Sequence, residues 1–126
     1  AIDGYAGIAG ALAELGKAAG RIDAAFNLLM HDVDEMWDHA AAGKEFTLEQ
    51  RTRYRTHGAI ICDIALAAGD DLVRNLGGSL LPLRPIERYF RDLHSMASHF
   101  LMQVNPSAEL HGRALLGLPL PANARI

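Results

Sequence analysis

The stretch IAGALAELGKAAGRIDAAFNLLMHDVDEM, residues 8–36, decides the fold class of this chain. Its apolar residues recur in alternating steps of four and three, which is the spacing along one face of an α-helix. We predict one long helix that continues to Ala42 and ends at Gly43, because glycine adopts left-handed dihedral angles at little cost. The members of this apolar row are Ile8, Leu12, Leu15, Ala19, Ile22, Phe26, Leu29, Val33 and Met36.

A second helix is predicted to begin at Thr47, whose hydroxyl can form a capping box with the side chain of Gln50. Small and apolar residues then repeat at helical spacing, so that a neighbouring helix could approach closely. The pair Gly77-Gly78 should end this helix. The repeating residues are Tyr54, Gly58, Ile61, Ala65, Ala68, Leu72 and Leu76.

A third helix is predicted from Pro85 to about Gln103, since proline fits the first turn of a helix, where its missing N–H does no harm. The pair Asn105-Pro106 should break it, and the tail Ser107–Leu118 could form a short fourth helix. No stretch alternates β-branched and polar residues as a strand would. The expected buried side of the third helix consists of Ile86, Tyr89 or Phe90, Leu93, Ala97 and Phe100.

These helices predict an all-α, antiparallel helical bundle that forms a single domain over residues 1–126. A helix of roughly 35 residues is about 50 Å long, too long for the shorter third helix to cover. The rest of its apolar row should therefore meet a partner, either another part of a longer polypeptide or another copy of this chain. We expect a homo-oligomer, a dimer or a tetramer.

Composition excludes several classes of function. The net charge is −3 and both signs are interleaved, so no basic field is present that would attract nucleic acid. The apolar stretches Ala59–Cys62 and Ile64–Ala68 are far shorter than a membrane span, and the first residues do not resemble a signal peptide. Cys62 cannot pair within the chain and lies in an apolar run, which favours a buried thiol in a cytoplasmic protein.

Residues near the start of the third helix could bind a ligand. Gly77 and Gly78, followed by Ser79, would let the backbone approach a flat or phosphorylated molecule, and Arg88 adds positive charge. Helical spacing also aligns an Arg–Asp–Ser–His row that could position a proton-transfer group. Simpler interpretations stay open. The glycines could be only a helix C-cap, Arg88 and Asp92 could form only a surface ion pair, and the histidines could be structural. The row consists of Arg88, Asp92, Ser95 and His99.

A metal centre is not predicted. His31, Glu35, Asp38 and His39 lie near one another on the first helix, but ferritin-like sites need a Glu-x-x-His motif on two helices. A solvated charged face is the preferred interpretation of this cluster. The separate histidines His57 and His111 are expected to serve packing or solubility.

Three segments together resemble the C-terminal helical domain of the acyl-CoA dehydrogenase superfamily. They are GGSLLPLRPIERYFRDLHSMASHF (77–100), RIDAAFNLLMHDVDEMWDHAAAGKEFTLEQRTRYR (21–55) and HGRALLGLPL (111–120). In the dehydrogenase branch the RD pair is usually followed by a stretch like I-Y-E-G-T. The segment Leu93–His99 is instead similar to the aromatic hydroxylases of two-component systems, which use reduced flavin.

The resemblance implies a fragment of a larger flavin-dependent enzyme that is inactive alone. In such systems a separate flavin reductase supplies reduced FMN or FAD, and one atom of oxygen enters a phenol-like ring. By the same resemblance His99 lies beside flavin and substrate as a base or hydrogen-bond donor, while Gly77, Gly78, Ser79 and Arg88 border the flavin. The alternatives are an acyl-CoA dehydrogenase domain and a non-catalytic helical dimerisation module.

Overall fold

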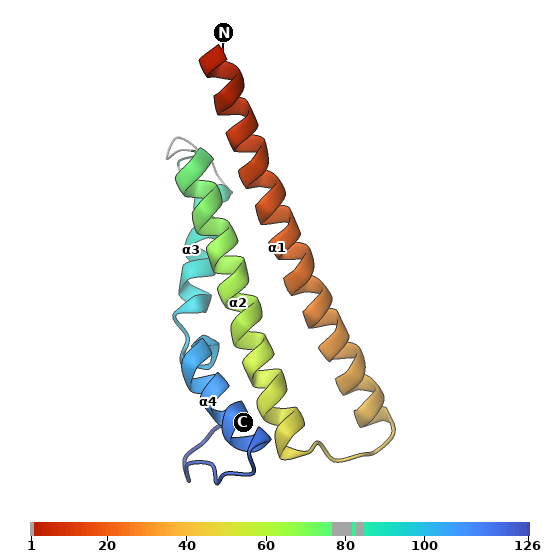
Figure 1. The fold of residues 1–126 in the computed structure, drawn as a ribbon. Helices are drawn as coiled ribbons and strands as arrows, with labels where there is room; N and C mark the ends of the chain where they lie inside the picture. Colours follow the sequence, from red (N-terminus) through yellow and green to blue (C-terminus); the bar gives the residue numbers. More distant parts are fainter. Residues whose placement is uncertain (1, 77–81, 83–84) are drawn as a thin grey trace.

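The computed structural model describes residues 2–76, 82 and 85–126, with side chains described from residue 7 onward except at residue 76. The described chain contains four α-helices, one short 3-10 helix and no strand, which confirms the all-α prediction. Figure 1 shows α1 and α2 running in opposite directions. The elements in order are α1 (Ile2–Ala41), α2 (Leu48–Leu76), α3 (Ile86–Ala97), the 3-10 helix η2 (Phe100–Met102) and α4 (Val104–Leu115).

The turn between the two long helices forms as its residues predict. Gly43 has a φ of +66°, the left-handed conformation that ends α1. At the start of α2 the Thr47 N–H donates to Gln50 Oε1 at 2.9 Å, and the Gln50 N–H donates to Thr47 Oγ1 at 3.1 Å. The predicted capping box is therefore present. The predicted end of the second helix at Gly77-Gly78 lies outside the described residues.

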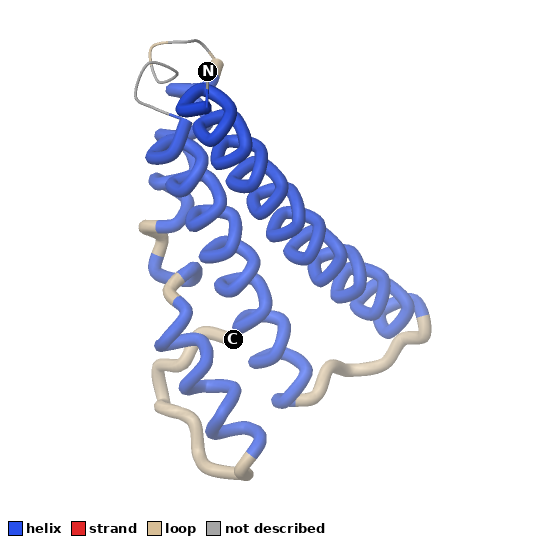
Figure 2. The backbone as a smooth tube through the Cα atoms, turned by 45° about the horizontal axis from the view of Figure 1, so that its top comes forward, coloured by secondary structure: helices blue, strands red, loops and turns tan. Residues whose placement is uncertain are grey.

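Helix α2 is the centre of the molecule. Figures 1 and 2 both show α1 on one side of α2, with α3, η2 and α4 following one another along the other side. Contacts between elements follow the same plan, since α2 packs against α1, α3, η2 and α4. The arrangement is a row of helices rather than a closed bundle, so one whole side of α1 faces away from the rest of the chain.

The contact between α1 and α2 is made by small and charged residues. Ala18, Ala25 and Asp32, spaced seven residues apart, are the buried positions of α1. The large apolar row predicted from the sequence lies one residue further along, so it is rotated by about 100° and points away from α2. Leu12, Phe26 and seven other large residues from Ile8 to Trp37 are each at least 40% exposed. The expectation that the third helix covers part of this row is wrong.

Buried hydroxyl groups join α2 to α4. Thr52 and Ser107 have no exposed surface, and Thr56 is 6% exposed. The Thr56 hydroxyl lies 2.9 Å from both Thr52 O and Ser107 O, and Thr52 Oγ1 lies 3.1 Å from Nδ1 of His111. Because buried polar groups must be hydrogen-bonded to be tolerated, these contacts fix the rotation of α4 against α2. His111 therefore serves packing, as expected.

The third helix is shorter than predicted, because α3 ends at Ala97 instead of about Gln103. The Ser98 hydroxyl donates to His94 O at 2.8 Å, and the Gln103 side chain donates to Ala97 O at 3.0 Å. The Gln103 side chain thereby satisfies the Ala97 carbonyl in the last turn of the helix, while His94 O accepts from the Ser98 N–H as well as from its hydroxyl. His99 then has extended dihedral angles, φ −69° and ψ 137°, and the chain turns into η2.

Two further expectations for this region are wrong. Asn105-Pro106 does not break a helix but lies in the first turn of α4, where the proline loses no helical hydrogen bond. No residue of α3 is buried, and Tyr89 is 65% exposed. Among the described elements α3 packs mainly against α2, so its apolar side stays largely uncovered. Leu93 packs against α2 at Gly69, where an added Cβ would lie 2.8 Å from Leu93 Cδ2.

None of the described helices combines the length and the apolar content that crossing a membrane requires.

Candidate functional site

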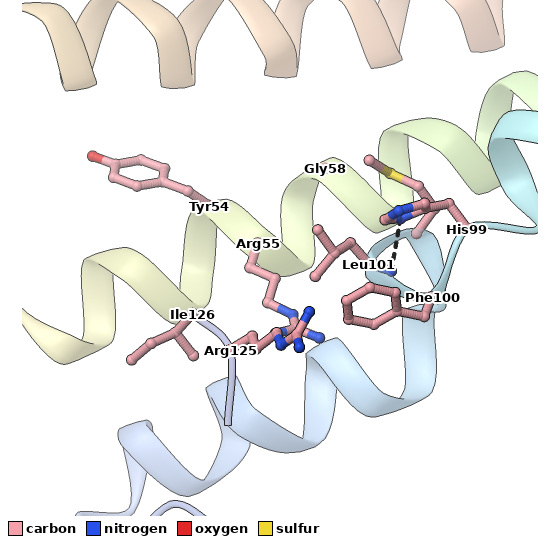
Figure 3. A pocket seen from close by; sticks show the side chains of 9 residues that line it. Tyr54, Arg55, Gly58, His99, Phe100, Leu101, Arg125 and Ile126 are labelled. Atoms are coloured by element: carbon pink, nitrogen blue, oxygen red, sulfur yellow. Dashed lines mark hydrogen bonds between the residues drawn. The ribbon is translucent and has the colours of Figure 1, made fainter. Parts of the chain in front are cut away.

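A hollow of about 580 Å³ lies between the middle of α2, η2 and the C-terminal tail. Its walls are mainly apolar, and its polar groups come from one histidine, one tyrosine and two arginines. Figure 3 shows the Arg55 and Arg125 side chains reaching toward each other beside the ring of Phe100, whereas the ring of Tyr54 points away toward α1. The lining residues are Tyr54, Arg55, Gly58, His99, Phe100, Leu101, Met102, Arg125 and Ile126.

His99 is held at the rim of this hollow by the turn that ends α3. Its Nδ1 accepts a hydrogen bond from the Leu101 N–H at 3.3 Å, and its ring lies 5.0 Å from the ring of Phe100 between centroids. Because Nδ1 is the acceptor, the neutral ring carries its proton on Nε2. Within the described part of the chain Nε2 has no hydrogen-bond partner, so His99 can present an N–H donor to a ligand.

The predicted row along the third helix is only partly assembled. Asp92, Ser95 and His99 line a second, open hollow of about 520 Å³ together with Met96, Leu101 and Met102. His99 lines this hollow with Asp92 and Ser95 although it lies beyond the end of α3 and has extended dihedral angles. His99 lines both hollows, together with Leu101 and Met102.

Arg88 does not join His99. Its Nε lies 3.7 Å from Asp92 Oδ2, and both side chains are more than half exposed, so the pair is the surface ion pair that the sequence left open. Such a pair contributes roughly 0–1 kcal/mol. Arg88 borders a separate depression with Pro85, Glu87 and Arg91. Gly77, Gly78 and Ser79 lie outside the described residues.

Arg55 and Arg125 are site residues that sequence reasoning missed. Arg55 Nε donates to the buried Ser107 Oγ at 3.3 Å, which directs the guanidinium toward the hollow. Arg125 lies over the ring of Phe100, with its Cζ 5.4 Å from the ring centroid. No spacing pattern links two residues 70 positions apart, and only the fold-back of the tail brings them together.

The other histidines have structural partners. His57 Nδ1 lies 2.8 Å from Oδ2 of the buried Asp32, and His94 Nε2 lies 2.7 Å from Asp70 Oδ1. The first pair joins α1 to α2, and the second joins α3 to α2. Both agree with the structural interpretation of these side chains.

The charged cluster on α1 is occupied by an arginine. Of the four residues considered from the sequence, His31 and Glu35 come together, and ligand atoms of these two and of Asp32 lie within 4.8 Å of one another. His39 instead lies 2.9 Å from Glu45 O, and Arg53 binds Glu35. The Tyr54 hydroxyl and the Arg53 guanidinium keep the pKa of Glu35 below its ordinary value. A cation would have to displace this guanidinium, so the cluster fits an ion-pair network between helices better than a metal site.

Cys62 is buried, as predicted, and burial raises the pKa of its thiol. A raised pKa lowers the fraction of thiolate, which is the nucleophilic form. Cys62 therefore serves as a small apolar residue of α2.

The comparisons with known proteins agree with the resemblance. Residues 9–104 match the family described as acyl-CoA dehydrogenase, C-terminal domain. The pigment production hydroxylase of Rhodococcus erythropolis is 35% identical over 102 residues, which cover 80% of this chain and 25% of that protein.

Two solved structures have the same fold. The HsaA monooxygenase of M. tuberculosis matches with a TM-score of 0.78 and 31% identity, over 86% of this chain and 29% of that one. The 3-HSA hydroxylase of Rhodococcus sp. RHA1 matches with a TM-score of 0.79 and 26% identity, over 88% of this chain and 30% of that one. The chain thus spans less than a third of each relative. All three relatives are hydroxylases or monooxygenases.

Proposed function

Because this chain belongs to the family of acyl-CoA dehydrogenase C-terminal domains, we propose that its 126 residues form the C-terminal domain of a longer flavin-dependent aromatic monooxygenase. The parent enzyme would act in the cytoplasm with reduced FMN or FAD delivered by a separate flavin reductase. Its relatives by sequence and structure include an enzyme called pigment production hydroxylase and the HsaA monooxygenase, which favours hydroxylation over acyl-CoA dehydrogenation.

The observation that carries this proposal is the position of His99. Its Nδ1 is occupied by the Leu101 N–H, and its Nε2 is free among the described residues at the junction of two hollows with apolar walls. A flat ring system needs apolar walls and a few directed polar groups, and this side of the chain offers both. Reduced flavin, when bound, would be the group that reacts with molecular oxygen. His99 would donate a hydrogen bond to an oxygen atom of the substrate or of the reacting group.

The domain would also hold subunits together. The exposed apolar row of α1 supports a homo-oligomer, because a contiguous apolar surface of this length is rare on monomeric proteins. Gly77, Gly78, Ser79 and Arg88 remain proposed flavin contacts. Arg88 is exposed and could reach a ligand held by another part of the enzyme.

The test is turnover of the full-length protein with reduced flavin, oxygen and a phenolic substrate. We expect an oxygen-dependent hydroxylated product, and His99→Ala should lower kcat by about a hundredfold while leaving flavin affinity nearly unchanged. His31→Ala is the matched control, since the His31 side chain is 72% exposed on α1. Unchanged turnover in His99→Ala would contradict the role of His99. Absence of both flavin binding and product would favour the non-catalytic dimerisation module.

A further inference from the structure

The hollow beside η2 contains a concentration of positive charge. Arg55 comes from α2 and Arg125 from the tail, and both line the hollow and reach toward one another (Figure 3). Among the described residues that line it, none has a carboxylate side chain. Two guanidinium groups that share a cavity repel each other, so an anion in the same place would be attracted by both.

The orientation of Arg55 is fixed, and part of its guanidinium is unused. Its Nε donates to Ser107 Oγ at 3.3 Å, and Ser107 is itself fully buried. Its Nη1 is buried and, in the described part of the molecule, has no hydrogen-bond partner. A buried N–H group without a partner is costly, and such an exception calls for an acceptor such as a bound water or ion.

Nearby acidic and carbonyl groups are engaged elsewhere. Glu109, in the adjoining hollow, accepts from Arg113 at 2.9–3.0 Å. The main-chain oxygen of Ile126 accepts from Arg51 at 3.2 Å. The Glu35 carboxylate pairs with Arg53 on the other side of α2. Arg55 and Arg125 are therefore left for a ligand.

The rest of the hollow suits a flat apolar group. Phe100, Leu101 and Met102 form one wall, and Arg125 stacks over the ring of Phe100 at 5.4 Å. Arginine binds carboxylate and phosphate through two parallel hydrogen bonds, which fixes the direction of the ligand as well as its charge. The His99 ring at the rim would then face the other end of a ligand held this way.

We propose that this hollow binds an anionic oxygen group, recognised by Arg55 and Arg125, on a ligand whose other part is flat and apolar. The anion is a carboxylate of an aromatic substrate or the phosphate of the flavin, which share this chemistry. The inference rests on the proposed function for placing the hollow in the active centre. It deepens that function by naming the ligand class and two specificity-determining residues.

The test is equilibrium binding to the full-length protein, measured by calorimetry without turnover. Benzoate is compared with benzamide, which has the same shape without the charge, and FMN is compared with riboflavin, which lacks the phosphate. For a carboxylate site, we expect benzoate to bind at least about tenfold more tightly than benzamide, and Arg55→Gln to remove most of that preference. For a phosphate site, the same loss should appear in the preference for FMN over riboflavin.

Arg125→Gln is the second variant, and it tests the site even if Arg55→Gln unfolds the protein by removing the contact with Ser107. Arg125 lies in the exposed tail, and its replacement should weaken binding of the preferred anion by about threefold to tenfold. Arg91→Gln is the control, because the Arg91 side chain is 69% exposed and pairs with Glu87 on α3. The proposal is overturned if neither anion is preferred over its neutral analogue, or if Arg91→Gln has the same effect as the other two.

Binding and turnover can fail separately. If the arginine variants lose anion binding while the full-length protein forms no hydroxylated product, the ligand class stands and the reaction assignment fails. If hydroxylation depends on His99 while no anion preference exists, the reaction assignment stands and the present inference fails.

Discussion

Asp32 is a charged side chain inside the contact between the two long helices. It is only 4% exposed, and its Oδ2 lies 2.8 Å from Nδ1 of His57 on α2. The partner replaces the hydrogen bonds of water at Oδ2, whereas Oδ1 is buried and has no hydrogen-bond partner among the described residues, so the carboxylate depends on His57. The sequence does not reveal the pair, since the two residues are 25 positions apart on different helices.

We expect Asp32→Ala to destabilise the fold by about 1–3 kcal/mol, because it leaves the partly buried His57 ring without its acceptor. The measurement is urea unfolding followed by circular dichroism. Glu109→Ala is the matched control: Glu109 is 61% exposed and pairs with Arg113 within α4, so its loss should change stability by less than about 1 kcal/mol. Equal effects of the two substitutions would show that the buried pair contributes no more to the free energy of unfolding than the exposed pair.

Two glycines, one within α1 and one just after it, have different roles. Gly16 lies in the middle of the helix, and a Cβ added there would meet nothing within 4 Å. Gly43 follows the helix with a φ of +66°, where a Cβ is strained whatever the space around it. The first glycine therefore only weakens the helix, whereas the second ends it.

Gly16→Ala should raise the free energy of unfolding by about 0.5–1 kcal/mol, because alanine has the better helix propensity and lowers the conformational entropy of the unfolded chain. Gly43→Ala should lower it by about 1 kcal/mol, because the left-handed conformation disfavours a side chain. Thermal unfolding of both variants checks the opposite signs. A gain in stability for Gly43→Ala would mean that the turn does not need its left-handed residue.

The molecule as a whole leaves its largest apolar residues outside. Its buried apolar residues are small apart from Leu110, whereas Phe26 is 58% and Trp37 75% exposed on the outer side of α1. Burial of such side chains is the main source of stability in folded proteins. The row on α1 therefore supports association, either with another copy of the chain or with the rest of a longer polypeptide.

We expect the chain to associate in sedimentation experiments, and Phe26→Asp to shift it toward the monomer by placing a charge in the row. Leu116→Asp is the control of the same chemistry, because Leu116 is 75% exposed at the end of α4, away from the row. A wild-type chain that sediments as a stable helical monomer would contradict the expected self-association. Equal effects of both variants would place the contact elsewhere.

The sequence by itself determined what depends on neighbours along the chain. The helical class follows from the four-and-three spacing, and the turn at Gly43 and the capping box from Thr47 to Gln50 follow from local backbone geometry. The family resemblance also identified His99 as a candidate, because its signature is a continuous string of residues.

Only the tertiary structure decided which face of each helix is covered. Spacing shows that Ile8 and Phe26 share a face, but it does not say whether that face meets α2, and the alanine row one residue earlier packs more closely. The same holds for the end of α3, which depends on the Gln103 side chain reaching back to Ala97, and for the meeting of Arg55 with Arg125. These contacts depend on how segments distant in sequence meet in space, and periodicity along one helix carries no information about that.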